Sequence, residues 1–227
     1  NNILKICNNK IRVISPDMGG AFGMRSSVYP EMPLVLWFSK LLGRPIKWTA
    51  SRSEGFLCDD QGRENWSSIT LALDKEFNFL ALRVKTLASL GAFISSSGAS
   101  PPTANLGGLA GVYKTPAIAV DVKGVFTNTI PISAYRGAGR PEASFAIERI
   151  IDHAAHELKV DPAFLRGKNT IPKDLIPFKT GLVFEYDSGN FKENLDKALS
   201  RADYNGFLKR YKEREKKNFL RGFGIAN

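Results

Sequence analysis

The chain has 227 residues, 43% hydrophobic and 24% charged, which is the composition of a globular protein of one or two domains. Its longest strongly apolar run, residues 34–38, is far too short to span a bilayer, and no secretory signal is visible, so the sequence predicts a cytoplasmic protein with no membrane partner. Cys7 and Cys58 are too few for a disulfide framework, a zinc site or an iron–sulfur cluster, and we expect two free thiols used in packing.

The net charge of +10 is concentrated near the C-terminal end of the sequence. Residues 201–227 hold eight basic and three acidic side chains, an excess of +5. Within 209–217 the acids recur at helical spacing, which is typical of a solvated helix face rather than of a nucleic-acid-binding stripe. We therefore expect no nucleic-acid partner. The only histidines, His153 and His156, fall on a predicted helix without other ligands nearby, so we expect them at its surface or in ordinary packing.

Apolar periodicity and turn residues predict the elements of the first half. These are a strand at 10–14, a glycine-rich loop at 19–23, a helix at 31–42 between Pro30 and Gly43, a buried strand at 45–50, and a polar loop at 51–64. A β-hairpin follows, with strands at 67–73 and 80–90 and a turn at 74–78, in which Leu80, Leu82 and Val84 face inward.

The second half mixes the same kinds of element. The predicted order is a small-residue stretch at 95–111, a strand at 118–126, a helix at 142–158, a short helix to residue 167 capped by Asp161 and begun by Pro162, an irregular stretch at 171–187, helices at 191–202 and 204–217, and a strand at 220–226. Strands and helices in this mixed order predict the α+β class, with mixed sheets and packed helices.

Two loops rich in small residues are the strongest functional signal. One reads Gly19-Gly20-Ala21-Phe22-Gly23, and the other reads Ala134-Tyr135-Arg136-Gly137-Ala138-Gly139-Arg140 before Pro141 opens a helix. Small side chains let a ligand approach backbone N–H groups, arginine suits oxyanions, and a helix N-terminus adds further donors. Together the loops predict one large, anionic, phosphate-bearing ligand.

Each loop also has a plainer interpretation. The glycines can mark a tight turn, and the arginines can lie at the surface, paired with Glu142 or Glu148. A dinucleotide-binding fold is disfavoured because there is no G-x-G-x-x-G and no acidic residue ends the segment 46–50. A P-loop is excluded because no G-K-[ST] is present.

These loops resemble the two molybdopterin-contacting loops of the molybdenum hydroxylase (xanthine oxidase) family. The resemblance is closest to large subunits of the aerobic carbon monoxide dehydrogenase-like and aldehyde oxidase type, and it extends over nearly the whole chain. Further segments carry it in the same order: Arg44-Pro45-Ile46-Lys47-Trp48, Leu90-Gly91-Ala92-Phe93, Gly111-Val112-Tyr113, Val125-Phe126-Thr127-Asn128, Ala146-Ile147-Glu148-Arg149 and Tyr186-Asp187-Ser188-Gly189.

The resemblance implies an elongated α+β molybdopterin-binding region, with molybdenum held by the pterin dithiolene and by no side chain. The pterin is either molybdopterin itself or its cytosine dinucleotide. The resemblance also places the backbone N–H of Phe22 near an oxygen ligand of molybdenum and makes Arg136, beside the metal, the catalytic residue. The implied cofactor-binding residues are Gly20, Ala21, Phe22, Gly23, Ala134, Tyr135, Arg136, Gly137, Ala138 and Gly139. Electrons would leave through iron–sulfur clusters to FAD on partner domains or subunits.

Four positions depart from the better-known members. Carbon monoxide dehydrogenases place a copper-binding cysteine directly after the loop arginine, where this chain has Gly137, so carbon monoxide is not the expected substrate. Ser26, Ala138 and Ala104 replace purine-contacting residues, so a xanthine pocket is not expected either. We expect an aldehyde or another aromatic heterocycle to be hydroxylated with oxygen from water.

Parts of the family's machinery are missing from this sequence. The general-base glutamate of the family lies several hundred residues further on, its substrate-side glutamine precedes residue 1, and Glu142 and Glu148 are not expected to replace the base. We therefore expect a middle slice of a large subunit, either a fragment or the product of a split gene, without turnover on its own. The expected division is a molybdopterin-binding domain at 1–170, partial at its N-terminus, and connecting helices with the truncated start of a second such domain at 171–227.

The expected partners are the rest of the large subunit or a split-gene companion, an iron–sulfur subunit, an FAD subunit and a small-molecule substrate. One alternative is a non-catalytic assembly module of the same complex that holds no cofactor. A basic nucleic-acid-binding domain is a weaker one.

Overall fold

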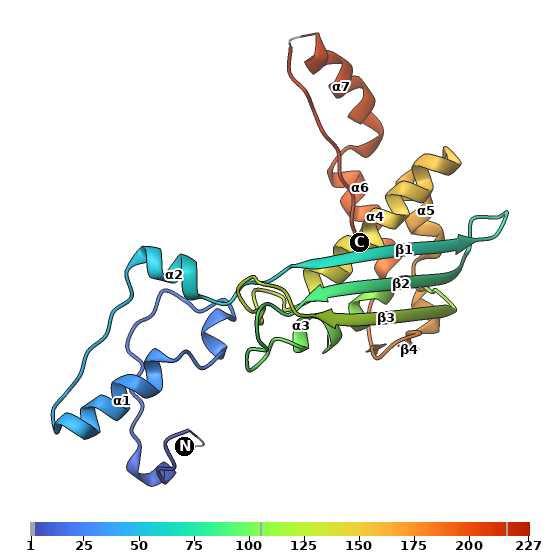
Figure 1. The fold of residues 1–227 in the computed structure, drawn as a ribbon. Coiled ribbons are helices and arrows are strands. Elements are labelled where there is room, and N and C mark those ends of the chain that lie inside the picture. The colour runs from blue at the N-terminus through green and yellow to red at the C-terminus, as the bar shows by residue number, and fades with distance from the viewer. Residues whose placement is uncertain (1–2, 105, 217) are drawn as a thin grey trace. The chain divides into compact units, whose positions relative to one another are not determined.

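The computed structural model describes residues 3–104, 106–216 and 218–227, and the chain forms two units. The first unit comprises Asn1–Glu64, Ala88–Pro102 and Gly124–Ala138, and the second comprises Asn65–Leu87, Thr103–Lys123 and Gly139–Asn227. Strands and helices are mixed along the chain (Figure 1), which confirms the α+β class.

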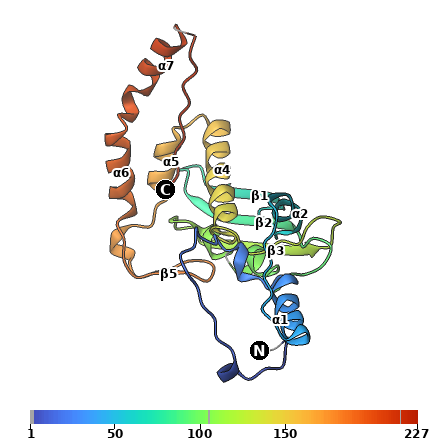
Figure 2. The same ribbon diagram turned by 90° about the vertical axis from the view of Figure 1, so that its left-hand side faces the viewer.

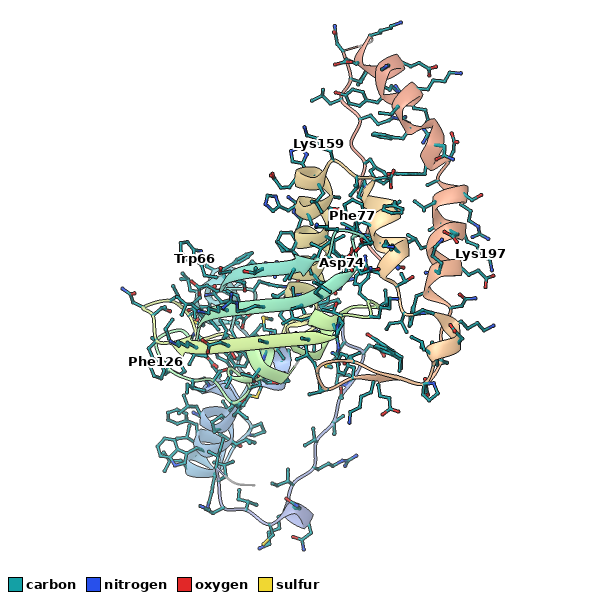
Figure 3. The ribbon with its side chains drawn as sticks, turned by 90° about the vertical axis from the view of Figure 1, so that its right-hand side faces the viewer. Trp66, Asp74, Phe77, Phe126, Lys159 and Lys197 are labelled. Atoms are coloured by element: carbon teal, nitrogen blue, oxygen red, sulfur yellow. The ribbon has the colours of Figure 1, made fainter. Side chains whose placement is uncertain are left out.

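A three-stranded sheet organises the second unit. Its strands are β1 (Asn65–Leu73), β2 (Phe79–Ser89) and β3 (Ala117–Val125), in the order β1-β2-β3. Figure 1 shows β1 running against β2, as the predicted hairpin requires, while β3 runs in the same direction as β2. The hairpin turn is closed by Asp74, whose Oδ1 accepts the Asn78 N–H at 2.7 Å. Figure 3 labels Asp74 and Phe77 at this end of the sheet.

The core of this unit lies between the sheet and helix α4 (Arg140–Leu158). Alternating side chains of β1 and β2, Leu82 and Val84 among them, point inward and meet Ile147 and Ile151 of α4. Figure 2 shows α4 against the sheet with α5 (Pro162–Asn169) beside it. The predicted inward position of Leu80 is wrong, because its side chain is 47% exposed and Phe79 is buried instead.

Helix α5 begins as predicted, with Asp161 as its N-cap. The Asp161 carboxylate accepts the N–H groups of Ala163 and Phe164 at 2.7 and 2.9 Å. The end of α5 fastens the hairpin, because Asn169 Oδ1 accepts the Phe79 N–H at 2.8 Å and its Nδ2 donates to the Phe77 carbonyl at 2.9 Å. Asn169 is completely buried, so these bonds satisfy backbone groups that water does not reach.

The remaining elements of this unit are shorter or more exposed. They are η3 (Leu106–Ala110), η4 (Lys173–Leu175), β4 (Phe178–Lys179) paired with β5 (Glu185–Tyr186), α6 (Phe191–Arg201), η5 (Tyr204–Gly206) and α7 (Phe207–Glu215). The predicted helix at 204–217 is therefore a 3-10 turn followed by α7, and Lys217 lies outside the described residues. The strand predicted at 220–226 is wrong, since this segment has no ladder partner in the described chain and Phe223 instead contacts the rings of Tyr204 and Phe207.

The first unit contains little regular structure. Its helices are α1 (Glu31–Leu42), which ends as predicted at Gly43 in the left-handed conformation, and α2 (Arg52–Cys58), while α3 (Ser100–Ala104) begins here; the 3-10 turns are η1 (Asn8–Lys10) and η2 (Met24–Ser26). The strands predicted at 10–14 and 45–50 are wrong, because both segments are largely exposed and lack ladder partners in the described chain. The polar loop predicted at 51–64 contains α2, which Ser51 and Glu54 start with a capping box. None of the described helices is long and apolar enough to cross a membrane.

Candidate functional site

The two glycine-rich loops lie against each other in the first unit, although more than a hundred residues separate them. The Arg136 N–H donates to the Phe22 carbonyl at 2.7 Å. At Gly23, a Cβ atom would stand 2.5 Å from the carbonyl oxygen of Ala134, and the φ angle is +98°. Both facts demand glycine, because a side chain would push the loops apart and strain the backbone. The sequence pattern therefore marks a real close approach of two main chains.

The side chains of Phe22 and Arg136 also meet. The Arg136 guanidinium carbon lies 5.7 Å from the centre of the Phe22 ring, within the range of a cation–π interaction. Phe22 has a φ of +52° and is 58% exposed, so its ring is presented at the surface. The ring and the guanidinium form one exposed pair in which the cation remains accessible to an anion.

The arginine loop turns sharply after Tyr135. The Ala138 N–H donates to the Tyr135 carbonyl at 2.8 Å, and the turn uses positive φ angles at Gly137 (+101°) and Ala138 (+46°). No hydrogen bond among the described residues uses the N–H groups of Phe22 or Gly137. Gly139 opens the second unit as the N-cap of α4, with a φ of +97°. The predicted start of that helix at residue 142 is thus two residues late, and Arg140 is its exposed first residue.

Three serine hydroxyl groups link the segments that lie next to the two loops. Ser133 Oγ lies 2.9 Å from Ser27 Oγ and 2.6 Å from Ser97 Oγ, and both Ser27 and Ser133 are buried. Ser95 Oγ donates to the Ile132 carbonyl at 2.8 Å. The small-residue stretch that begins at residue 95 therefore helps to position the arginine loop.

Tyr29 fastens the segment after the glycine loop. Its hydroxyl donates to the Met24 carbonyl at 3.2 Å and accepts the Asp60 N–H at 3.1 Å. Burial is the main cause that raises the pKa of Tyr29, with the nearby carboxylates of Asp60 and Asp59 acting in the same direction. The neutral hydroxyl can therefore serve as donor and acceptor at once.

Sequence reasoning missed Arg63, which lies beside the arginine loop. Its Nη1 donates to the Tyr135 carbonyl at 2.8 Å, and its Nη2 donates to the Arg136 carbonyl. The sequence offered only Gly62 next to an arginine as a signal, and that pair does not reveal a partner seventy residues away.

Outside the loops, Glu148 and the cysteine and histidine side chains, which could act as a base or bind a metal, are either used in an ion pair or exposed to solvent. Glu148 is paired with the buried Arg166, whose Nε lies 2.7 Å from Glu148 Oε2. Both cysteines are exposed thiols rather than packing residues, since the segments that carry them are not covered. His153 and His156 lie on the exposed face of α4. Within the described residues, no three His, Cys, Asp or Glu side chains are grouped as metal ligands.

The arrangement fits a bulky anionic ligand held mainly by main-chain groups. Glycines without Cβ atoms allow close approach, N–H groups without protein partners can donate, and Arg136 adds a fixed positive charge. Because the described residues contain no group of three His, Cys, Asp or Glu side chains that could hold a metal ion, a metal at this site would have to arrive with its own ligands.

Comparisons with known proteins agree on one family. The model of the molybdopterin cofactor-binding domain matches residues 1–170. The chain is 38% identical over 205 residues to the carbon monoxide dehydrogenase large chain of Hydrogenophaga pseudoflava, covering 88% of this chain and 25% of that one. It is 31% identical over 228 residues to the nicotine 6-hydroxylase large subunit of Paenarthrobacter nicotinovorans, covering 96% of this chain and 27% of that one.

Solved structures give the same result. Quinoline 2-oxidoreductase from Pseudomonas putida 86 superposes with a TM-score of 0.82 at 31% identity, over 89% of this chain and 26% of that one. Carbon monoxide dehydrogenase from Oligotropha carboxidovorans superposes with the same TM-score at 33% identity and the same coverage. The chain thus spans about a quarter of the length of its relatives, and it belongs to the molybdenum hydroxylase family, as a molybdopterin cofactor-binding domain.

Proposed function

We propose that the loops at 19–23 and 134–139 hold molybdopterin in a molybdenum-dependent oxidoreductase that hydroxylates an aromatic heterocycle with oxygen from water. The observation that carries this proposal is the contact of the two loops at Phe22 and Arg136, which joins a glycine cradle to a fixed guanidinium. The bound group would supply molybdenum and its dithiolene, and with them the redox chemistry.

The chain's own residues would bind the pterin and stabilise negative charge at the reacting centre. Gly20, Ala21, Gly23, Ala134, Tyr135, Ala138 and Gly139 would form the loops that contact the pterin, and the N–H groups of Phe22 and Gly137 would donate to anionic oxygens. Arg136 would be the catalytic residue, stabilising negative charge that develops beside the reacting centre. Its contact with the Phe22 ring would hold the guanidinium in place before substrate arrives.

The residue after the arginine argues against carbon monoxide as the substrate. Gly137 has no side chain, so no thiolate stands beside the centre to hold a soft metal such as copper. Two of the relatives compared above are named for nitrogen heterocycles, nicotine and quinoline. We therefore favour an aromatic heterocycle, and turnover of an aldehyde instead would revise the substrate class while leaving the cofactor proposal intact.

Further polypeptide would complete the enzyme. Helix α1 has no buried residue, and seven of its apolar side chains are between 42% and 63% exposed: Met32, Leu34, Leu36, Trp37, Phe38, Leu41 and Leu42. A helix that is apolar on all sides normally lies inside a larger protein. We propose that the rest of a large subunit covers it and that iron–sulfur and FAD subunits accept the electrons. A division at residue 170 and a cytoplasmic location belong to the same proposal.

The assembly-module alternative is not favoured. A module that only docks partners has no need for an exposed turn whose Gly137 N–H has no hydrogen-bond partner among the described residues. The match to a cofactor-binding family also counts in favour of cofactor binding.

Metal and pterin analysis of the assembled protein tests the proposal directly. We expect about one molybdenum and one pterin for each copy of this chain, released together when the protein is denatured. Absence of both from protein purified with its partners would reject cofactor binding.

Substitution of Arg136 separates catalysis from binding. We expect Arg136→Ala to lower kcat about a hundredfold, as loss of a charge-stabilising donor does, while most of the molybdenum is retained. The matched control is Arg83→Ala, which removes an exposed arginine of β2 in the other unit and should leave kcat unchanged. Equal loss of molybdenum and of turnover in Arg136→Ala would make the role of Arg136 structural.

A further inference from the structure

Arg63 donates hydrogen bonds to the main chain of the arginine loop. Nη1 donates to the Tyr135 carbonyl at 2.8 Å, Nη2 donates to the Arg136 carbonyl, and the guanidinium carbon lies 5.0 Å from the centre of the Tyr135 ring. A guanidinium is planar, with its donors in a fixed fork. One side chain therefore sets the orientation of two consecutive peptide groups.

The segment that carries Arg63 is itself anchored to the strand-like stretch before the loop. The Gln61 N–H donates to the Pro131 carbonyl at 3.1 Å, and the Ser133 N–H donates to the Gln61 carbonyl at 2.9 Å. Arg63 has a φ of +73°, a conformation that a non-glycine residue keeps only where its surroundings hold it. The backbone of Arg63 is therefore held in place, and this fixes the position from which its guanidinium reaches the loop.

The orientation of these peptides determines which groups the loop presents. In a trans peptide the N–H points away from the preceding carbonyl, so the Gly137 N–H faces away from Arg63 once the Arg136 carbonyl is bound to it. The Arg136 N–H is meanwhile used by the Phe22 carbonyl. Gly137 is exposed, and no hydrogen bond among the described residues uses its N–H.

We infer that Arg63 is a positioning residue, which holds the Gly137 N–H and the Arg136 side chain in the orientation that meets an anionic ligand. This inference rests on the proposed function of the loop. The positive charge of Arg63 alone does not account for these two hydrogen bonds, because a cation can lie near any carbonyl group. The guanidinium of Arg63 instead binds two neighbouring carbonyl groups, those of Tyr135 and Arg136. Lysine would keep the charge and lose the fork, which gives the experiment its contrast.

Amide hydrogen exchange of the cofactor-free chain, resolved by residue, tests the positioning. In Arg63→Lys and in Arg63→Gln we expect the Arg136 and Ala138 amides to exchange about tenfold faster, because the carbonyls that organise the turn lose their shared donor. The Met32 amide, bonded to the Tyr29 carbonyl at 3.1 Å in the same unit, should keep its rate. The control Arg52→Gln removes an exposed arginine stacked 4.8 Å from the Phe56 ring and should change neither loop amide. Unchanged loop amides, or equal acceleration at Met32, overturns the inference.

The assembled enzyme provides the second readout. Both Arg63 variants should lower kcat about tenfold and leave KM within about twofold, since a displaced Arg136 weakens charge stabilisation without altering substrate contacts. An Arg63→Lys enzyme with normal kcat would mean that charge alone matters and would overturn the positioning role. The two proposals fail separately: absence of molybdenum from the unsubstituted protein rejects the cofactor, whereas the exchange result reports on Arg63 whether or not cofactor binds.

Discussion

The two units of this chain bury their apolar side chains to very different extents. The second unit encloses a cluster from β2, η3, α4 and α5 whose central members, Ile151 and Leu165 among them, are fully buried. The first unit carries both glycine-rich loops, yet its longest helix, α1, buries no residue. Hydrophobic burial is the main stabilising contribution to folding, so the second unit must hold most of the chain's own stability. The first unit instead carries the candidate site, whose order depends on hydrogen bonds and close main-chain contacts.

The sharpest test of this contrast is the buried ion-pair network of the second unit. Arg166 is completely buried, and its guanidinium bonds Glu148 Oε2 at 2.7 Å and Asp152 Oδ1 at 2.8 Å, while Tyr113 donates to Glu148 Oε1 at 2.8 Å. Burial acts to lower the pKa of Arg166, but the hydrogen bond and charge of Glu148 outweigh it and raise the pKa. Arg166→Met leaves the Glu148 carboxylate without its partner, so we expect a loss of about 4 kcal/mol in the free energy of unfolding, measured with urea and circular dichroism.

Arg149→Met is the control for that change, because Arg149 contacts the same Asp152 at 3.4 Å from a side chain that is 61% exposed. We expect its effect to remain within about 0.5 kcal/mol. Equal effects of the two substitutions would show that burial does not determine the contribution of these arginines.

A pair of leucines tests the contrast without charge. Leu165 of α5 is fully buried and Leu41 of α1 is 63% exposed. We expect Leu165→Ala to cost about 3 kcal/mol, through lost burial and the cavity left behind, and Leu41→Ala to cost less than about 0.5 kcal/mol in the isolated chain. Comparable losses would mean that the first unit has an apolar core of its own and would break the comparison.

The site is expected to respond to a change that hardly affects global stability. Gly23→Ala places a methyl group 2.5 Å from the Ala134 carbonyl at a φ of +98°, so the loops must separate. We expect the molybdenum content of the assembled protein to fall about tenfold, because the loops no longer hold their relative position. Gly19→Ala is the control, since no atom lies within 4 Å of its Cβ position. Normal molybdenum in Gly23→Ala would separate the cofactor from this pair of loops.

Sequence periodicity predicted the second unit well and the first unit poorly, for the same physical reason. The hairpin, α4 and α6 have one apolar face each because they pack against a core inside the chain, so alternation and helical spacing report their structure. The apolar runs at 10–14 and 45–50 looked like strands, but they have no ladder partner in the described chain, and pairing rather than composition makes a strand.

The two loops could be recognised because their runs of small residues stand out in the sequence. The φ of +98° at Gly23 is a local demand that favours glycine, whereas its close contact with the distant Ala134 could not be predicted. Arg63 and the Ser27–Ser133–Ser97 hydroxyl chain could not be found this way, because their partners are set by how distant segments fold together. Helix α2 had a readable signal, the capping box at Ser51, which lay in a segment too polar to draw a helix prediction.

The smallest expected effect concerns the link between α5 and the C-terminal segment within the second unit. The Tyr204 hydroxyl donates to Asp161 Oδ2 at 2.9 Å, and burial, followed by this hydrogen bond and the charge of Asp161, raises the pKa of Tyr204 from 10.0 to about 12. The native state therefore favours the neutral phenol more than the unfolded state does. Its stabilising contribution is complete below pH 10 and is lost as the pH rises through about 12.

Urea unfolding between these pH values should show a steeper loss of stability for the natural protein than for Tyr204→Phe, in which Asp161 Oδ1 still caps α5. Tyr211→Phe, on α7, should follow the natural protein. Parallel curves for the natural protein and Tyr204→Phe would mean that this hydrogen bond does not tie the C-terminal segment to the core-bearing unit.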